Sequence, residues 1–210
     1  MMEMTMKLLG RADSLNVRKA LWGLAELGLT AEREDRGGPF GGTDTEDYLS
    51  LNPNGLVPTL IDGETVVWES NTILRYLGER SGPTVFSGRD PAERAAIGEW
   101  MDWQLGALNP PLQTVFIQLV RLNEDRRDAA RTAAALDDVH KQLAVLGRSL
   151  PSDGPLLGAD VTAADVALGV MLHRYYALVA EPKADDRVAR YHARLAGRPG
   201  FAAHVAIGKP

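Results

Sequence analysis

The sequence predicts an α/β N-terminal domain with a small mixed sheet, followed by an all-α C-terminal domain. Three observations support this fold class. Short β-prone runs alternate with helix-like patterns up to about Arg80. Residues 81–90 then contain glycines and a proline and are typical of a linker. Almost everything that follows has the apolar periodicity of helices. We therefore expect one domain over residues 1–81 and a second over residues 90–210.

The first elements of the predicted sheet are a strand, a helix and a second strand. Residues 6–10 form a short apolar run typical of a buried strand, and residues 31–35 form a weaker one. Between them, Ser14 stands where a helix N-cap is expected and Gly28 where the helix should end. The apolar residues between these two lie on one helical face: Val17, Ala20, Leu21 and Leu24. This order predicts a parallel strand pair with a right-handed crossover.

The second half of the predicted α/β domain is a hairpin followed by a helix. A glycine-rich loop over residues 37–43 and a short helical turn over 45–51 come first. Two β-prone runs, 57–61 and 65–68, then flank Asp62-Gly63-Glu64, and Asp-Gly between such runs is a strong hairpin signal. The helix that completes this domain is expected over residues 70–80.

The C-terminal domain is predicted from helix start and stop signals. Asp90-Pro91-Ala92-Glu93 is typical of a helix N-terminus, and the helix should reach about Leu108. Asn109-Pro110-Pro111 should then kink or break it. A capping box at residues 161–165 opens a later helix that ends near Val179. Further helices are expected to about residue 120 and over residues 125–150, 187–196 and 201–205.

Composition excludes several classes of function. The net charge of −5, without a block of Lys or Arg, is unlike that of a nucleic-acid-binding protein. No apolar run approaches the roughly 18 residues of a membrane span, and we see no signal peptide, so we expect a cytoplasmic protein without a membrane partner. The absence of cysteine excludes disulfides and a protein thiol nucleophile. The four histidines lack metal-ligand spacing, so no metal site is expected.

The stretch over residues 52–76 has the features of a site that holds a peptide. Pro58 opens a strand, and a cis bond to Val57 would expose the Val57 main chain, although an edge-strand proline in trans is the commoner arrangement. Glu69-Ser70 precedes a helix, whose N-terminus could bind a carboxylate while Glu69 binds an ammonium group. The alternative is an ordinary helix start with Glu69 solvated.

Three segments together resemble the cytosolic glutathione S-transferase family. They read NPNGLVPTL at residues 52–60, WES followed by NTILRYL from residue 68, and GPLLGADVTAADVALG at residues 154–169. They occur in the order and spacing of that family. The resemblance implies a thioredoxin-like N-terminal domain, a homodimer and glutathione as co-substrate. It also implies that the glutathione thiol is activated as a thiolate, for conjugation to an electrophile or reduction of a peroxide.

The resemblance implies a role for each residue of this stretch. Val57, followed by Pro58, would pair its main chain with the cysteinyl part of glutathione, and Glu69 and Ser70 would hold the γ-glutamyl end. The catalytic residue lies between the first strand and the first helix, where Ser14 is the first candidate. Asn16 is the second, because Ser14-x-Asn16 is similar to a motif of some bacterial members. Helix capping is the competing interpretation of both residues.

The chain departs from the family pattern at Leu56. Many relatives carry Lys or Arg there to reach the glycine carboxylate of glutathione, which leucine cannot do. Arg18, Arg11 and the loop over residues 37–42 are possible substitutes. Arg36 is as easily interpreted as a solvated side chain.

The co-substrate pocket is expected in the helical domain, with Trp103 and Arg174 as candidate residues. Trp100, Met101 and Gln104 share the long helix with Trp103, and core or dimer packing explains the tryptophans equally well. Two other functions stay open on this fold: a glutathione-dependent disulfide reductase and a non-catalytic dimeric ligand-binding protein. The sequence does not identify the electrophile.

Overall fold

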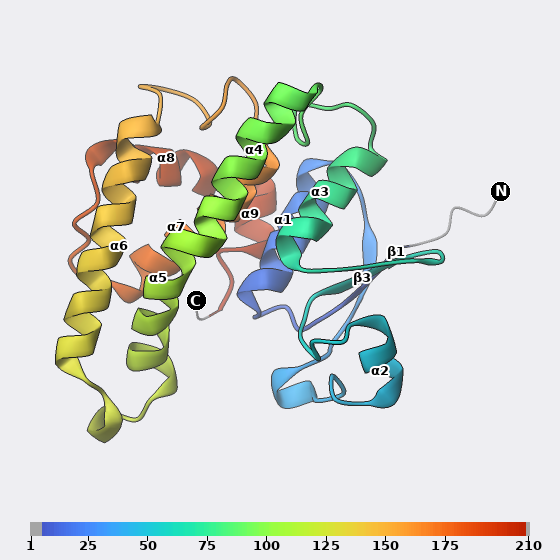
Figure 1. Ribbon diagram of the computed structural model, residues 1–210, viewed down its shortest axis with the longest axis horizontal. Helices are drawn as coiled ribbons and strands as arrows, with labels where there is room; N and C mark the ends of the chain where they lie inside the picture. The colour runs from blue at the N-terminus through green and yellow to red at the C-terminus, as the bar shows by residue number, and fades with distance from the viewer. Residues whose placement is uncertain (1–5, 209–210) are drawn as a thin grey trace.

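The computed structural model describes residues 6–208 and contains the predicted four-stranded mixed sheet (Figure 1). Its strands are β1 (Met6–Leu9), β2 (Ala31–Glu34), β3 (Thr59–Asp62) and β4 (Thr65–Trp68). They lie in the order β2-β1-β3-β4, with β1 parallel to β2 and antiparallel to β3, and β3 antiparallel to β4. Together with the helical C-terminal part, this arrangement confirms the predicted fold class.

Two helices cover the sheet on the side that faces the rest of the molecule. These are α1 (Leu15–Glu26) and α3 (Ser70–Arg80), which contact each other, whereas the short α2 (Glu46–Leu51) lies away from both (Figure 1). A single-turn 3-10 helix, Gly38–Phe40, interrupts the glycine-rich loop. The core between sheet and helices is apolar and consists of Met6, Leu8, Val17, Ala20, Leu24, Leu60, Ile73 and Leu77.

The hairpin between β3 and β4 is confirmed, but its loop is one residue shorter than the predicted Asp62-Gly63-Glu64. Asp62 pairs with Thr65, so Gly63 and Glu64 form the loop, and Gly63 takes the left-handed conformation with φ 61°. Asp62 stays in the ladder because its carboxylate accepts a hydrogen bond from the Tyr76 hydroxyl at 2.8 Å.

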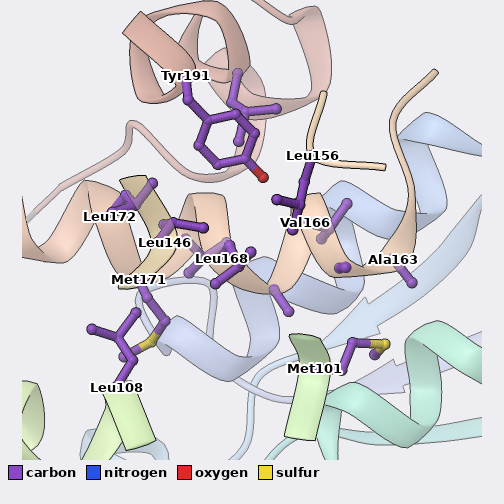
Figure 2. Close-up of a cluster of buried hydrophobic side chains, with 14 of the residues drawn as sticks. Met101, Leu108, Leu146, Leu156, Ala163, Val166, Leu168, Met171, Leu172 and Tyr191 are labelled. Atoms are coloured by element: carbon purple, nitrogen blue, oxygen red, sulfur yellow. The ribbon is translucent and has the colours of Figure 1, made fainter. Parts of the chain in front are cut away.

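Six α-helices form the C-terminal part: α4 (Pro91–Trp103), α5 (Asn109–Phe116), α6 (Ala129–Ser149), α7 (Ala163–Leu178), α8 (Asp186–Ala196) and α9 (Pro199–His204). The central one is α7, whose apolar side chains point into the packed core together with Met101, Leu108, Leu146 and Tyr191 (Figure 2). The predicted capping box opens it: Asp165 Oδ2 accepts the Thr162 N–H at 2.8 Å. No helix within residues 6–208 combines the length and apolarity needed to cross a membrane.

The predicted break at Asn109-Pro110-Pro111 is a change of helical winding. A π-helical turn, Gln104–Leu108, joins α4 to α5, and the backbone stays in the helical region at both Leu108 and Asn109. Figure 1 shows the helical path bending where α4 passes into α5. The prolines lie in the first turn of α5, where a missing N–H is best tolerated, so the helix bends but does not end. A second π turn, Ile117–Arg121, extends it.

The two parts of the chain share one apolar core. Trp22 of α1 is fully buried, and a Cβ on Gly169 of α7 would lie only 2.8 Å from its ring. Phe201 of α9 meets the same ring edge to face, at 5.0 Å between centroids. The segment between α3 and α4 is also attached, because the Ala163 N–H donates to the Phe86 carbonyl at 2.9 Å. The cleft described below is therefore bounded by parts that pack tightly against each other.

Candidate functional site

A cleft of about 900 Å³ lies between the sheet-containing part and the helical part of the molecule. One wall comes from the start of α1, the glycine-rich loop, the chain before β3 and the start of α3. The other comes from α5, from the π turns on either side of it, and from α7. The residues that carry polar groups or main chain into it include Arg11, Ser14, Asn16, Lys19, Val57, Glu69, Ser70, Gln104, Gln113, Arg121 and Arg174.

The start of α1 brings Ser14 and Asn16 to the cleft, as the sequence predicts. Ser14 occupies the N-cap position and is mostly buried, but its hydroxyl makes no capping hydrogen bond. The Asn16 side chain is also engaged elsewhere, because its Oδ1 accepts the Ser70 hydroxyl at 3.2 Å. Neither side chain therefore caps the helix, and the capping interpretation does not explain them.

The main chain of Val57 is available for pairing. The Val57–Pro58 peptide bond is cis, the alternative that the sequence left open. Neither the N–H nor the carbonyl of Val57 has a hydrogen-bond partner within residues 6–208. The neighbouring Leu56 carbonyl, in contrast, accepts from the Tyr48 hydroxyl at 2.7 Å and from Asn52 Nδ2 at 2.8 Å. Val57 therefore presents an unpaired donor and acceptor at the edge of the cleft.

The start of α3 forms the polar end of the cleft. Ser70 is the first residue of the helix, and Glu69 precedes it with φ 69° and ψ 118°. Glu69 is the one non-glycine residue with positive φ in the described part of the chain. The first main-chain bond of the helix runs from Ile73 N–H to the Glu69 carbonyl at 2.8 Å, so the preceding N–H groups have no partner in the helix. A carboxylate suits this helix end, and the Glu69 carboxylate beside it suits an ammonium group.

Lys19 is a feature of the cleft that the sequence interpretation missed. Its side chain is fully buried, and Nζ donates to Asn71 Oδ1 at 3.0 Å and Gln104 Oε1 at 3.1 Å. Burial without a carboxylate partner lowers the pKa of Lys19 to about 7, against the attraction of Glu69. The sequence contained an indication of this burial. Lys19 follows Leu15 by four residues and therefore lies on the helical face that is buried.

Arg174 of α7 lies in the opposite wall, where the sequence placed it as a pocket residue. It is 7% exposed, its Nη1 donates to Gln113 Oε1 at 3.1 Å, and its Nε is buried without a hydrogen-bond partner. The guanidinium lies 4.2 Å from the centroid of the Phe116 ring. Burial, followed by the nearby Arg18 and Arg121, lowers the pKa of Arg174 to about 10.

Two other predicted residues do not reach the cleft. Arg18 is 1% exposed, and its Nη1 donates to the Val205 carbonyl at 3.2 Å, so it ties α1 to the C-terminal end of the chain. Trp103 packs against the central core and stacks edge to face on Trp100, with 5.2 Å between ring centroids. Neither residue lines the cleft, so both assignments are corrected: Arg18 is buried against the end of the chain, and Trp103 is partly buried against the core.

Arg11 is a second cation of the first wall that lines the cleft, beside Lys19. A Cβ on Gly38 would lie only 3.0 Å from its Nε, so the glycine-rich loop packs against the guanidinium. Arg11 Nε also pairs with Asp13 at 3.0 Å. Leu56 is 64% exposed and offers no charge. No group of three or more potential metal-ligating side chains occurs within the described residues.

Two family models match the chain. The model described as "Glutathione S-transferase, N-terminal domain" matches residues 4–79, and "Glutathione S-transferase, C-terminal domain" matches residues 129–206. The first match covers the sheet-containing part, and the second covers α6 to α9 and part of the tail that follows.

Individual relatives extend these matches over nearly the whole chain. Glutathione S-transferase GstB of Escherichia coli (strain K12) is 32% identical over 200 residues, 94% of this chain and 96% of the relative. The crystal structure of the theta class glutathione S-transferase from Xanthomonas axonopodis pv. citri with glutathione bound has a TM-score of 0.91 and 37% identity, covering 98% of this chain and 99% of that one. A probable elongation factor 1-gamma 2 of Arabidopsis thaliana is 29% identical over 74% of this chain but only 38% of its own length.

Proposed function

The chain belongs to the glutathione S-transferase family, and from that membership we propose that its cleft activates the glutathione thiol as a thiolate for transfer to an electrophile. The observation that carries the proposal is that Ser14, Asn16, Val57, Glu69 and Ser70, which are far apart in the sequence, line one cleft. Conjugation to an electrophile and reduction of a peroxide both begin from the thiolate, so both are compatible with this site.

The glutathione peptide fits the unpaired groups of the first wall. We assign the Val57 N–H and carbonyl to the cysteinyl residue, because they lack partners within residues 6–208. The γ-glutamyl carboxylate is assigned to Ser70 and the first N–H groups of α3, and its ammonium to Glu69. Arg11 is the assigned partner of the glycine carboxylate, in place of the Arg18 expected from the sequence.

Activation of the thiol needs only a modest stabilisation of the anion. A thiol with a pKa of about 8.5 is roughly 3% ionised at neutral pH. Lowering that pKa by about two units corresponds to roughly 2.7 kcal/mol, and one charge-assisted hydrogen bond contributes about 1.5–3 kcal/mol. Ser14 is the proposed donor because its hydroxyl is not used for capping, and the N-terminus of α1 adds to the effect.

The test of this function combines binding and turnover. Calorimetry should detect glutathione binding, and one of three assays should show turnover: a chlorinated aromatic, a hydroperoxide or a mixed disulfide, each with glutathione. Ser14→Ala should raise the apparent pKa of the bound thiol in the pH–rate profile. An unchanged profile together with an inactive Asn16→Ala would transfer the role to Asn16. No binding and no turnover in any assay would reject the enzyme.

Two alternatives rest on specific features. A disulfide reductase would need two glutathiones in one site, because the chain has no cysteine to form a mixed disulfide. A non-catalytic role is favoured by Leu56 and by the partial match to a relative named as an elongation factor subunit. The three assays separate these alternatives from conjugation.

We also propose a cytoplasmic homodimer, in which residues 1–81 bind glutathione and residues 90–210 provide the co-substrate pocket. Sedimentation of the purified protein would test the dimer. Isolated expression of each segment, followed by glutathione binding, would test the division.

A further inference from the structure

The helical wall of the cleft contains positive charge that has no carboxylate partner. Arg174 is nine-tenths buried, and its only side-chain hydrogen bond within residues 6–208 goes to the neutral amide of Gln113. Its Nε is buried and unpartnered. A buried guanidinium in this condition is costly unless an acceptor fills the vacant position. This wall therefore lacks an anionic partner for Arg174.

Arg121 adds a second positive charge to the same wall of the cleft. Its guanidinium lies 5.3 Å from the centroid of the Phe116 ring, the ring on which Arg174 also packs. Arg121 is exposed, and its positive charge contributes to lowering the pKa of Arg174. Both residues line the cleft, so an anion bound there near both would reduce their repulsion.

The balance of charge in the cleft is opposite to that of the chain. Four Lys or Arg residues line it, against two acidic residues, in a protein of net charge −5. The acidic residues are Asp13, which is paired with Arg11, and Glu69, which lies at the start of α3 in the other wall. Glutathione carboxylates have their own candidate partners on that wall. The charge on α5 and α7 is therefore left for a second ligand.

Apolar side chains border this cationic position. Leu105 and Val120 both line the cleft and are 39% and 40% exposed. Leu105 belongs to the π turn before α5, and Val120 belongs to the π turn after it, where Arg121 is its neighbour in the chain. Both line the same cleft as Arg174. A ligand that fills this wall should combine an apolar body with an anionic end.

We propose that the electrophilic co-substrate carries a carboxylate or another oxyanion, which binds Arg174 and Arg121 while its apolar body packs on Leu105 and Val120. The forked guanidinium of Arg174 suits a carboxylate better than a point charge would. Gln113 accepts a hydrogen bond from the guanidinium and orients it, but its neutral amide does not neutralise the positive charge. This inference rests on the proposed transferase function, whose co-substrate class it specifies.

A binding experiment without glutathione tests the anion site separately from catalysis. The probe is the fluorescence of anilinonaphthalene sulfonate, compared with neutral phenylnaphthylamine, which has the same rings without the sulfonate. The native protein should bind the sulfonate at least about tenfold more tightly, the effect of one charge-assisted hydrogen bond. Arg174→Gln should abolish most of this preference, and Arg121→Gln should reduce it about threefold. Because Arg121 is exposed, its variant should fold even if Arg174→Gln does not.

Arg148→Gln is the matched control, because Arg148 is exposed on α6 and does not line the cleft. It removes the same charge from the chain and should leave the preference unchanged. An equal preference in all four proteins would overturn the inference, and so would an equal effect of Arg148→Gln.

The kinetic experiment uses a chloronitrobenzoate and the corresponding chloronitrobenzamide with glutathione. Arg174→Gln should lower the benzoate-to-benzamide ratio of kcat/KM at least about tenfold. An unchanged ratio with both compounds turned over would reject the anion site and leave the transferase intact. A loss of glutathione affinity as large as the loss for the benzoate would show that Arg174 serves glutathione and would also reject the inference. Absence of glutathione binding in the native protein would instead reject the proposed function.

Discussion

Glu69 occupies a left-handed backbone conformation that costs an L-residue about 1–2 kcal/mol and glycine very little. Its φ of 69° puts it in the region where strain is expected, and it stands at the cleft beside Ser70. Glycine would adopt this backbone conformation with less strain, so the backbone alone does not explain why the residue is glutamate. A function of the carboxylate explains it, which is consistent with the proposed binding of an ammonium group.

Two substitutions at Glu69 separate the strain from the ligand contact. Glu69→Ala keeps a Cβ and its strain, whereas Glu69→Gly removes both, so we expect the glycine variant to unfold with a free energy about 1 kcal/mol higher than the alanine variant. Both should bind glutathione about tenfold or more weakly, because both lose the carboxylate. Urea unfolding and calorimetry measure the two quantities. Equal stabilities would argue against strain, and intact binding would remove Glu69 from the γ-glutamyl site.

Lys19 makes the stability of the fold depend on pH. Its pKa is about 7 in the folded protein and 10.5 in the reference state. Between these values the unfolded chain binds more protons, so the free energy of unfolding rises with pH from about 7 to about 10.5. Below pH 7 both states are protonated, and Lys19 contributes no pH dependence. The slope should be at most about 1.4 kcal/mol per pH unit.

Lys19→Met should remove this slope. The free energy of unfolding of the native protein relative to the variant is expected to rise by roughly 2 kcal/mol between about pH 7 and pH 9. Comparing the two proteins cancels other titrating groups. Any constant loss from the buried Asn71 and Gln104 amides, which lose their Lys19 partner, does not affect the slope. Urea unfolding at the two pH values checks this. A difference that stays constant with pH would show that Lys19 is not the titrating group.

Local patterns together with the family resemblance brought Ser14, Asn16, Val57, Glu69 and Ser70 into one predicted site, and in the structure these residues line one cleft. Local patterns could not predict the different environments of two adjacent residues in one helix turn. Arg18 and Lys19 are neighbours in sequence, yet Arg18 points to the C-terminal end of the chain and Lys19 to the cleft. The partner of Arg18 is Val205, just after α9, and the partners of Lys19 are on α3 and on the π turn after α4. No local pattern specifies these contacts.

At the scale of elements, the sequence predicted type and order well and boundaries less well. The α3 helix covers the predicted residues 70–80, but α6 begins at Ala129 and not near residue 125, because the Asp128 carboxylate caps the Arg131 N–H at 2.9 Å. The proline pair before α5 was expected to kink or break the helix, and the π turn that accommodates it has no signature in local composition.

Two helical glycines allow the effect of side-chain packing to be separated from the effect of helix propensity. Gly169 of α7 has no space for a Cβ, which would lie 2.8 Å from the Trp22 ring and 2.9 Å from Leu195. Gly98 of α4 has no neighbour within 4 Å of the same position. The intrinsic gain from replacing a helical glycine by alanine is about 0.5–1 kcal/mol at both sites. The two glycine-to-alanine substitutions should therefore differ in their effect on the free energy of unfolding, and this difference measures how tightly α7 packs at Gly169, including its contact with α1.

We expect Gly98→Ala to raise the free energy of unfolding by about 0.5–1 kcal/mol and Gly169→Ala to lower it by about 1–3 kcal/mol. The loss arises because Trp22 is fully buried and its rigid ring cannot move aside. Chemical denaturation of both variants beside the native protein measures this. Stabilisation by both substitutions would mean that the α1–α7 contact is looser than described.

At the scale of the whole molecule, α1 belongs to two cores. Val17, Ala20 and Leu24 pack on the sheet, whereas Trp22 packs on α7 and α9. Glu26 adds a polar link at the end of the same helix.

That link joins the sheet-containing part to the last helix of the chain. The Glu26 carboxylate accepts two bonds from Arg198, from Nε at 2.8 Å and Nη2 at 2.6 Å, and one from Trp22 Nε1 at 2.6 Å. The two bonds from Arg198 join residues 172 apart in the sequence, so patterns within single elements could not predict them. The cleft is formed by the same junction, and its two walls should hold their relative position only while α1 stays packed.

Trp22→Ala tests whether the two parts unfold as one. Deleting a fully buried aromatic side chain should lower the free energy of unfolding by about 3–5 kcal/mol. Because α1 serves both cores, slowly exchanging amides of β1 and of α6 should lose protection by the same amount in native-state hydrogen exchange. Phe40→Ala, at a ring that is 56% exposed, should change both by less than about 1 kcal/mol. If α6 kept its protection while β1 lost it, the helical part would be stable on its own, and the glutathione wall could move relative to the co-substrate wall.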